Sequence, residues 1–297
     1  MDPSAAGTLA SILSDVALPA LFAGVVAVLA TVVVERFGGA AGGILSSIPT
    51  TIVPAAIGIW GRSADAESFR RTMAFVPVGI LLNAGYLVLW RVIPAKLGQR
   101  SRNHLLALTL VLALGAWLVA AGAVMAAHDL LRPSIASVLW TGAFAACAGL
   151  ALGIAANRTP HPAPKGTRRV GPLVLVVRGI AAGVVIGAAI ALSRAGLPVA
   201  SGIAAVFPVI FTTIMVATWI AQGAQVPTGA VGPMALGTLS VSAYALLAIL
   251  IYPAMPIALA AIVTWIAAVA CVSVPAYLYL RAVRARHERA MRAATGA

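Results

Sequence analysis

The sequence predicts an all-α fold, a polytopic bundle of about nine transmembrane helices. Hydrophobic residues make up 62% of the 297-residue chain and charged residues only 9%, whereas a soluble domain carries about 25% charged residues. Several apolar stretches are longer than the roughly 18 residues that mark a membrane-spanning helix. The two halves of the chain also resemble each other when the sequence is shifted by 159 positions. Together these observations favour a membrane protein built from an internal repeat.

Short polar connections divide the apolar sequence into nine predicted spans. They cover residues 16–34, 38–60, 72–93, 105–127, 133–155, 171–192, 198–221, 230–252 and 256–280. The connection at 157–169 is rich in proline and basic residues, so we expect an extended, solvated linker there. We predict five regions: an N-terminal extracytoplasmic segment, a first membrane repeat, a linking span with a basic cytoplasmic loop, a second membrane repeat and a basic cytoplasmic tail. They cover residues 1–15, 16–127, 128–170, 171–280 and 281–297.

The distribution of basic residues predicts the orientation. With the N-terminus outside, 14 Lys and Arg residues fall on the cytoplasmic side and 5 in the outer loops. Because basic residues are enriched in cytoplasmic loops, we expect a multi-pass protein of the plasma (cell inner) membrane with a cytoplasmic C-terminus. The net charge of +13 arises in short loops and the tail. We therefore expect no nucleic-acid partner, since no soluble basic domain is present to bind one.

Rare residues coincide at the offset of 159. About 13 residues are identical over about 72 positions, and the matches include Gly43 with Gly202, Pro49 with Pro208, Trp60 with Trp219 and Pro94 with Pro253. The copies cover spans 1–4 and 6–9, so five spans separate their starts. Because five is odd, the copies enter the membrane from opposite faces. We therefore predict an inverted 4+1+4 repeat, an architecture common among secondary transporters.

Two predicted spans, 38–60 and 198–221, are interrupted by prolines at matching places, Pro49 and Pro208. Proline removes a backbone donor and clashes with the preceding helical turn, and the carbonyl groups left without partners need hydroxyl groups or water. A matched pair of interrupted spans indicates a binding site near the bilayer midplane, although kinked helices with close glycine packing would give the same pattern. The predicted substrate-binding residues are Ser46, Ser47, Pro49, Thr50, Thr51, Asn83, Ser201, Pro208, Thr212, Thr213 and Ser242.

Charged residues in or beside the spans are candidates for charge recognition or coupling, because charges are costly in hydrocarbon. These candidates are Glu35, Arg178 and Arg194. Glu35 could equally be an interfacial carboxylate, and the long side chain of Arg178 could snorkel to the interface.

The spacing Gly202-x4-Phe207-Pro208, in a span followed by one with Ser242 and Tyr244, resembles the small GlpM-like bacterial membrane proteins. The first half repeats the spacing with Ile48 in place of phenylalanine. The chain thus resembles a tandem, inverted duplication of such a unit with one extra span. The resemblance supplies no catalytic residues.

Residue patterns typical of enzymes are absent from the sequence. The spacing of the four histidines, His104, His128, His161 and His287, is not that of metal ligands. No span carries a pair of carboxylates for acid–base catalysis. We therefore expect no catalytic residue, metal or cofactor. The favoured function is a secondary transporter of a small polar metabolite, with anionic and lipid-linked compounds as candidate classes. The alternative is a non-transporting membrane scaffold or cell-envelope assembly factor. Expected partners are the lipid bilayer and a small-molecule substrate, and a homo-oligomer stays open.

Overall fold

A computed structural model of the chain describes residues 17–29, 48–98, 101–158 and 171–295. Within these ranges the regular elements are helices, without a strand. Seven helical stretches are long and apolar enough to cross a membrane, and a shorter apolar helix covers Ala17–Leu29. The prediction of an all-helical, multi-pass membrane bundle is thereby confirmed. The count of nine spans and the inverted repeat stay predictions.

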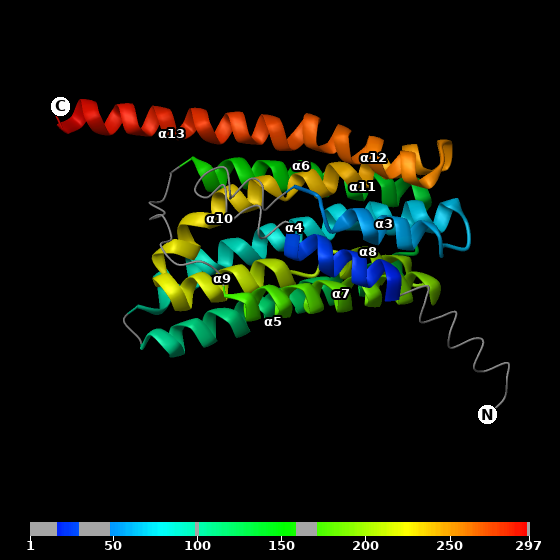
Figure 1. Cartoon of the computed structure of the whole chain (residues 1–297), viewed down its shortest axis with the longest axis horizontal. Helices are drawn as coiled ribbons and strands as arrows, with labels where there is room; N and C mark the ends of the chain where they lie inside the picture. The colour runs from blue at the N-terminus through cyan, green and yellow to red at the C-terminus, as the bar shows by residue number, and fades with distance from the viewer. Residues whose placement is uncertain (1–16, 30–47, 99–100, 159–170, 296–297) are drawn as a thin grey trace.

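The helices that follow the first one, 17–29, lie side by side along one axis (Figure 1). They are α3 (Ile52–Trp60), α4 (Ala66–Leu97), α5 (Arg102–Leu131), α6 (Ile135–Asn157), α7 (Pro172–Arg194), α8 (Pro198–Ala204), α9 (Val209–Gln222), α10 (Gln225–Gly237), α11 (Leu239–Ile251), α12 (Ile257–Ala268) and α13 (Val274–Thr295). The 3₁₀ turn η1 (Tyr252–Ala254) follows α11, and the π-helical segment η2 (Val269–Ser273) joins α12 to α13. Three predicted spans therefore consist of two helices in series: α8–α9, α10–α11 and α12–α13.

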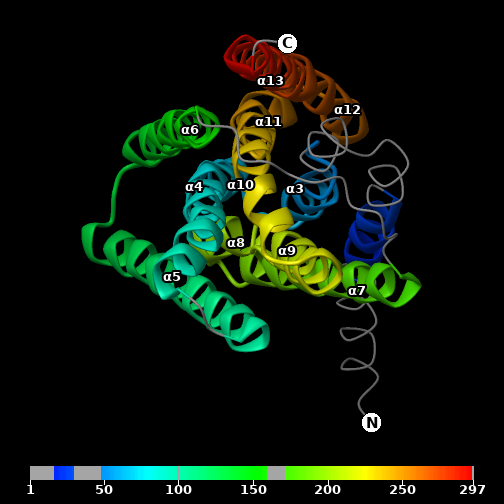
Figure 2. The ribbon, with the colours of Figure 1, turned by 90° about the vertical axis from the view of Figure 1, so that its left-hand side faces the viewer.

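Helix α4 is the centre of the bundle. It packs against α5, α6, α8, α10 and α11, which surround it in the end-on view of Figure 2. In the most apolar 18-residue stretch of α4, 72% of the residues are buried, whereas in that of α5 only 22% are buried. Large side chains on the outer helices are correspondingly exposed, among them Val119, Trp140 and Phe144. Exposed apolar surface on this scale indicates contact with lipid.

Glycines bring several helices into backbone contact. A methyl group added at Gly24 would lie 2.7 Å from the carbonyl oxygen of Gly179, between helix 17–29 and α7. One added at Gly142 would lie 2.5 Å from the Ala74 oxygen, between α6 and α4, and one at Gly202 in α8 would overlap the Thr72 oxygen. Such close approach is typical of membrane helices, whose association depends on van der Waals packing. The glycines of the predicted span 38–60 that could pack in the same way, Gly38, Gly39, Gly42 and Gly43, lie outside the described residues.

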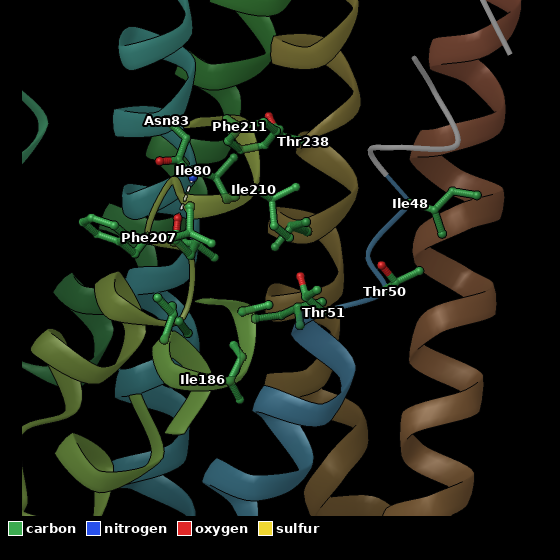
Figure 3. A pocket seen from close by; sticks show the side chains of 17 residues that line it. Ile48, Thr50, Thr51, Ile80, Asn83, Ile186, Phe207, Ile210, Phe211 and Thr238 are labelled. Atoms are coloured by element: carbon green, nitrogen blue, oxygen red, sulfur yellow. Dashed lines mark hydrogen bonds between the residues drawn. The ribbon is translucent and has the colours of Figure 1, made fainter. Parts of the chain in front are cut away.

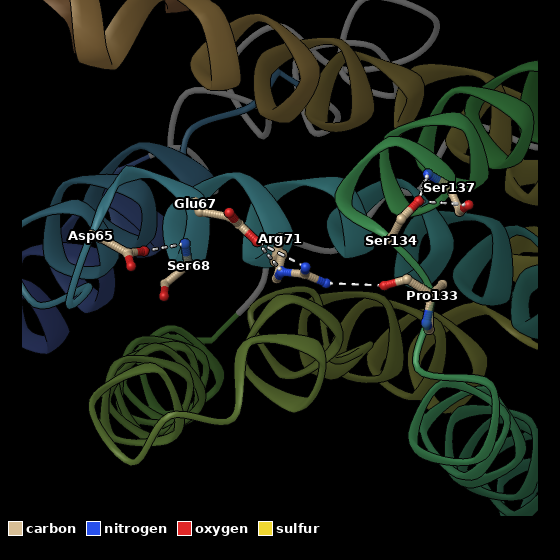
Figure 4. Close-up of polar contacts among 7 residues, drawn as sticks. All are labelled: Asp65, Glu67, Ser68, Arg71, Pro133, Ser134 and Ser137. Carbon is tan, nitrogen blue, oxygen red and sulfur yellow. Dashed lines mark hydrogen bonds and ion pairs between the residues drawn. The ribbon is translucent and has the colours of Figure 1, made fainter.

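Helix α4 begins at an aspartate cap that gives the fold a dependence on pH. The Asp65 carboxylate accepts the Ser68 backbone N–H at 2.7 Å (Figure 4), and this bond holds the pKa of Asp65 below its ordinary value of 3.8. The folded pKa is below the unfolded one, so the contribution of Asp65 is complete above the unfolded pKa and is lost as pH falls through the folded pKa. We expect Asp65→Ala to lower the unfolding temperature at pH 7 and to flatten its decline below pH 4. Asp65→Asn should keep the cap yet flatten the decline in the same way, because it removes the same carboxylate. Unfolding in detergent between pH 7 and pH 3 measures both variants.

Candidate functional site

A break separates α8 from α9, around Phe207 and Pro208. The backbone N–H of Phe207 donates to Ala204 O at 3.0 Å and that of Val209 to Phe207 O at 2.7 Å, so the chain turns tightly instead of continuing as a helix. Pro208 has no N–H of its own to give to the preceding turn. The predicted interruption of span 198–221 is thus present, at the residue expected to cause it.

A second non-helical segment, residues 48–51, directly precedes α3 and is called the second break below. Helix α3 begins at Ile52, three residues after Pro49. At the offset of 159, Pro49 corresponds to Pro208. The two breaks therefore fall at matching sequence positions.

The helices that follow the two breaks run towards opposite ends of the bundle. Trp60 ends α3 and packs its ring against Phe69, near the start of α4, with centroids 4.9 Å apart. Trp219 lies near the end of α9 and packs against Trp90, near the end of α4, with centroids 6.0 Å apart. Because a helix rises 1.5 Å per residue, Phe69 and Trp90 are roughly 30 Å apart. Helices α3 and α9 are therefore antiparallel, as Figure 1 also shows.

A cavity of about 80 Å³ lies between the two breaks, with further lining from α4, α7 and the start of α11 (Figure 3). Its polar lining residues are Thr50, Thr51, Asn83 and Thr238, and its other described lining residues are apolar. A water needs about 10–15 Å³ measured in this way, so the cavity has room for a few waters or a small polar group. Drug-sized ligands need about 300 Å³ or more, so a larger substrate would require the site to open.

Asn83 holds the break between α8 and α9 in place. It is buried, and its Nδ2 donates to Val206 O at 2.6 Å, while its Oδ1 accepts Trp117 Nε1 at 2.8 Å. The Trp117 ring in turn packs edge-on against Phe207, with centroids 5.0 Å apart. One amide therefore joins α4 and α5 to a carbonyl that the break has freed.

Helix α9 is held to its neighbours by polar contacts. Thr212 Oγ1 lies 2.8 Å from the Tyr86 hydroxyl on α4. Arg178 on α7 is only 4% exposed, and its Nε donates to Thr213 Oγ1 at 3.2 Å. Arg178 thus takes part in the contact between α7 and α9. The sequence alone had also allowed its side chain to extend to the membrane interface.

The predicted site residues separate into three groups. Thr50, Thr51 and Asn83 line the cavity. A second group adjoins it without lining it. In this group Thr212 and Thr213 make the contacts above, Pro208 precedes α9, and buried Ser201 donates to Ala189 O at 2.7 Å. The third group is not brought to the cavity. Ser242 is buried, and its Oγ has no partner among the described residues. Pro49 is buried, Arg194 is exposed at the end of α7, and Glu35, Ser46 and Ser47 lie outside the described residues.

Two polar groups at the site were not predicted. Thr238 lines the cavity from the junction of α10 and α11, and Trp117 positions Asn83 from α5. Tyr86 also contacts the site, through Thr212. It lies three residues after Asn83, a spacing that places both side chains on one face of a helix, and this spacing is the one feature of the sequence that points to the contact. Among the described residues no three His, Cys, Asp or Glu side chains gather to hold a metal.

No known protein family matches the chain, and no curated protein or solved structure is detectably similar to it. The resemblance to GlpM-like proteins therefore stays a prediction.

Proposed function

We propose that this chain is a secondary transporter of a small polar metabolite that works by alternating access, with the substrate bound between the two breaks. The observation that carries the proposal is the cavity with four polar lining residues where the starts of the antiparallel helices α3 and α9 meet. Broken helices leave backbone N–H and C=O groups unpaired at mid-membrane depth, and transporters use such groups to bind substrates and ions. The matched breaks also support an inverted 4+1+4 repeat, whose halves would move against each other.

The alternative, a membrane scaffold or assembly factor, would need helix contacts but no cavity. The glycine contacts between α4, α6 and α8 suit both functions. The buried Arg178 beside α9 favours anionic substrates within the transporter proposal, because a charged side chain held inside a membrane bundle usually has a functional partner.

Thiol labelling from each side of the membrane tests the proposal without a known substrate. In a background with Cys147→Ala and Cys271→Ala, both exposed positions, cysteine would be placed at Thr51 and at Thr238. A membrane-impermeant maleimide would then be added to right-side-out or inside-out vesicles. Alternating access predicts labelling of both cavity positions from both sides. Labelling from neither side would favour the scaffold, and labelling from one side only would contradict alternating access.

Three further cysteine variants serve as controls. Ser242→Cys places a thiol at a buried position outside the cavity lining, so it should stay unlabelled. Arg62→Cys and His287→Cys place thiols at exposed positions. The predicted topology requires labelling of the first from the outer side and of the second from the cytoplasmic side.

A further inference from the structure

A second polar pocket lies where α4 and α5 meet the turn before α6, away from the cavity. Its volume is about 370 Å³, and it is lined by Arg71, His128, Asp129, Arg132 and Pro133. Arg71 holds the turn over the pocket, because its Nη1 donates to Pro133 O at 3.3 Å (Figure 4). Pockets of this size accept small-molecule groups, and none of these residues has a role in the proposed transport site.

The backbone at Arg132 is strained. Its φ of 43° makes it the one described non-glycine residue with a positive φ. The residue that follows a helix in this conformation is usually glycine, because a Cβ is disfavoured there. An arginine at this position is therefore retained at a cost in stability, which is typical of functional sites.

One lining residue, His128, has a buried ring nitrogen without a partner among the described residues. The His128 side chain is 18% exposed and lies 3.5 Å from Asp129, atom Nδ1 to atom Oδ1. Its ring packs edge-on against Phe75, and its Nε2 is buried with no hydrogen-bond partner among the described residues. A buried polar atom without a partner is costly, so this end of α5, like the backbone at Arg132, is not optimised for stability alone.

The charges of the pocket suit a ligand with both signs. Arg71 pairs with Glu67 at 2.8 Å, but Glu67 is 54% exposed, and exposed pairs are weak. The guanidinium groups of Arg71 and Arg132 therefore offer donors for a phosphate, since arginine binds phosphate oxygens well. Asp129, whose side chain is 83% exposed, offers an acceptor for an ammonium group.

The surface beside the pocket is apolar. Leu130 and Leu131 end α5 and are 83% and 74% exposed, directly before Arg132. From the shared turn, α5 and α6 leave on different sides of α4, against which each of them packs (Figure 2). A ligand in the pocket would thus have a polar site for its head and apolar helix surface for its tail.

We propose that this pocket binds the headgroup of a zwitterionic phospholipid of the phosphatidylethanolamine type. Arg132 and Arg71 hold the phosphate, Asp129 accepts from the ammonium group, and the acyl chains lie against the apolar end of α5. The site is separate from the cavity, so the outcome of the thiol labelling does not bear on it.

Native mass spectrometry of the detergent-purified protein tests the proposal. We expect saturable binding of phosphatidylethanolamine and weaker binding of phosphatidylglycerol, which lacks the ammonium group, and of phosphatidylcholine, whose ammonium group has no N–H. Arg132→Gly should weaken phosphatidylethanolamine binding about tenfold or more, which corresponds to one lost charge-assisted contact. The same variant should unfold at an equal or higher temperature, because glycine relieves the strain. Lost binding with kept stability separates a ligand role from a structural one.

Matched variants complete the experiment. Arg71→Ala should weaken binding, whereas Arg70→Ala, at the exposed neighbouring position, should not. Asp129→Asn should remove the preference for phosphatidylethanolamine over phosphatidylglycerol. Unchanged binding in Arg132→Gly would overturn the proposal. So would equal binding of all three lipids, or binding of soluble phosphoethanolamine as tight as that of the lipid.

Discussion

Gly202→Ala is expected to destabilise the protein by about 3 kcal/mol, the upper part of the range for overpacking a close-packed interior. The added methyl group would overlap the Thr72 carbonyl oxygen and also lie 3.0 Å from the Phe75 Cβ. Because the main obstacle is backbone of the central helix, no rotamer change can relieve it, and α8 must move away from α4. The free energy of unfolding in detergent, followed by circular dichroism, measures the effect.

Gly115→Ala is the matched control. Gly115 lies in the middle of α5, and a methyl group there would meet no atom within 4 Å. Alanine is a better helix former than glycine by about 1 kcal/mol, so this variant should be as stable as the parent or more so. Equal effects of the two substitutions would contradict the close contact between α8 and α4.

Asn83→Leu is expected to have the second largest effect. It leaves the Trp117 N–H and the Val206 carbonyl without their partner, at about 1–3 kcal/mol for each buried group left unpaired. We expect a total loss of roughly 3 kcal/mol. The break between α8 and α9 should also become mobile, which hydrogen exchange at residues 205–212 would detect.

Ser242→Ala provides the comparison, because Ser242 occupies the position 159 residues after Asn83. The Ser242 Oγ is buried without a partner among the described residues, so its removal breaks no bond described in the structure. The change in stability should be within about 0.5 kcal/mol. A large loss at Ser242 together with a small one at Asn83 would show that the amide does not hold the break.

Local chemistry explains which parts of the site could be predicted from the sequence. Pro208 interrupts its helix through a missing N–H, an effect confined to neighbouring turns, so the break was predictable from the sequence. Thr50 and Thr51 directly follow Pro49, so their place in the cavity followed from the second break.

Helix phase explains the residues that the sequence placed less well. Thr212 and Thr213 lie inside α9, and which face of α9 meets α4 or α7 decides their partners, Tyr86 and Arg178. That face depends on packing between distant segments. The roles of Trp117 and Thr238 depend on such packing as well, and no spacing in the sequence links either of them to the breaks.

The π-helical segment η2 also determines where the C-terminal arginines point. The helical rod Ile257–Ala290 has 34 residues, about 51 Å at 1.5 Å per residue, whereas the hydrocarbon core is about 30 Å thick. The part of α13 that carries Arg281 and the arginines after it therefore extends beyond the lipid core. A π-bulge inserts one extra residue into a helix, and one residue corresponds to a rotation of about 100°. The direction in which the arginines of α13 point around the helix axis is thus set at Val269–Ser273, within the apolar part of the rod. It is not set by the residues of the tail that carry the charge.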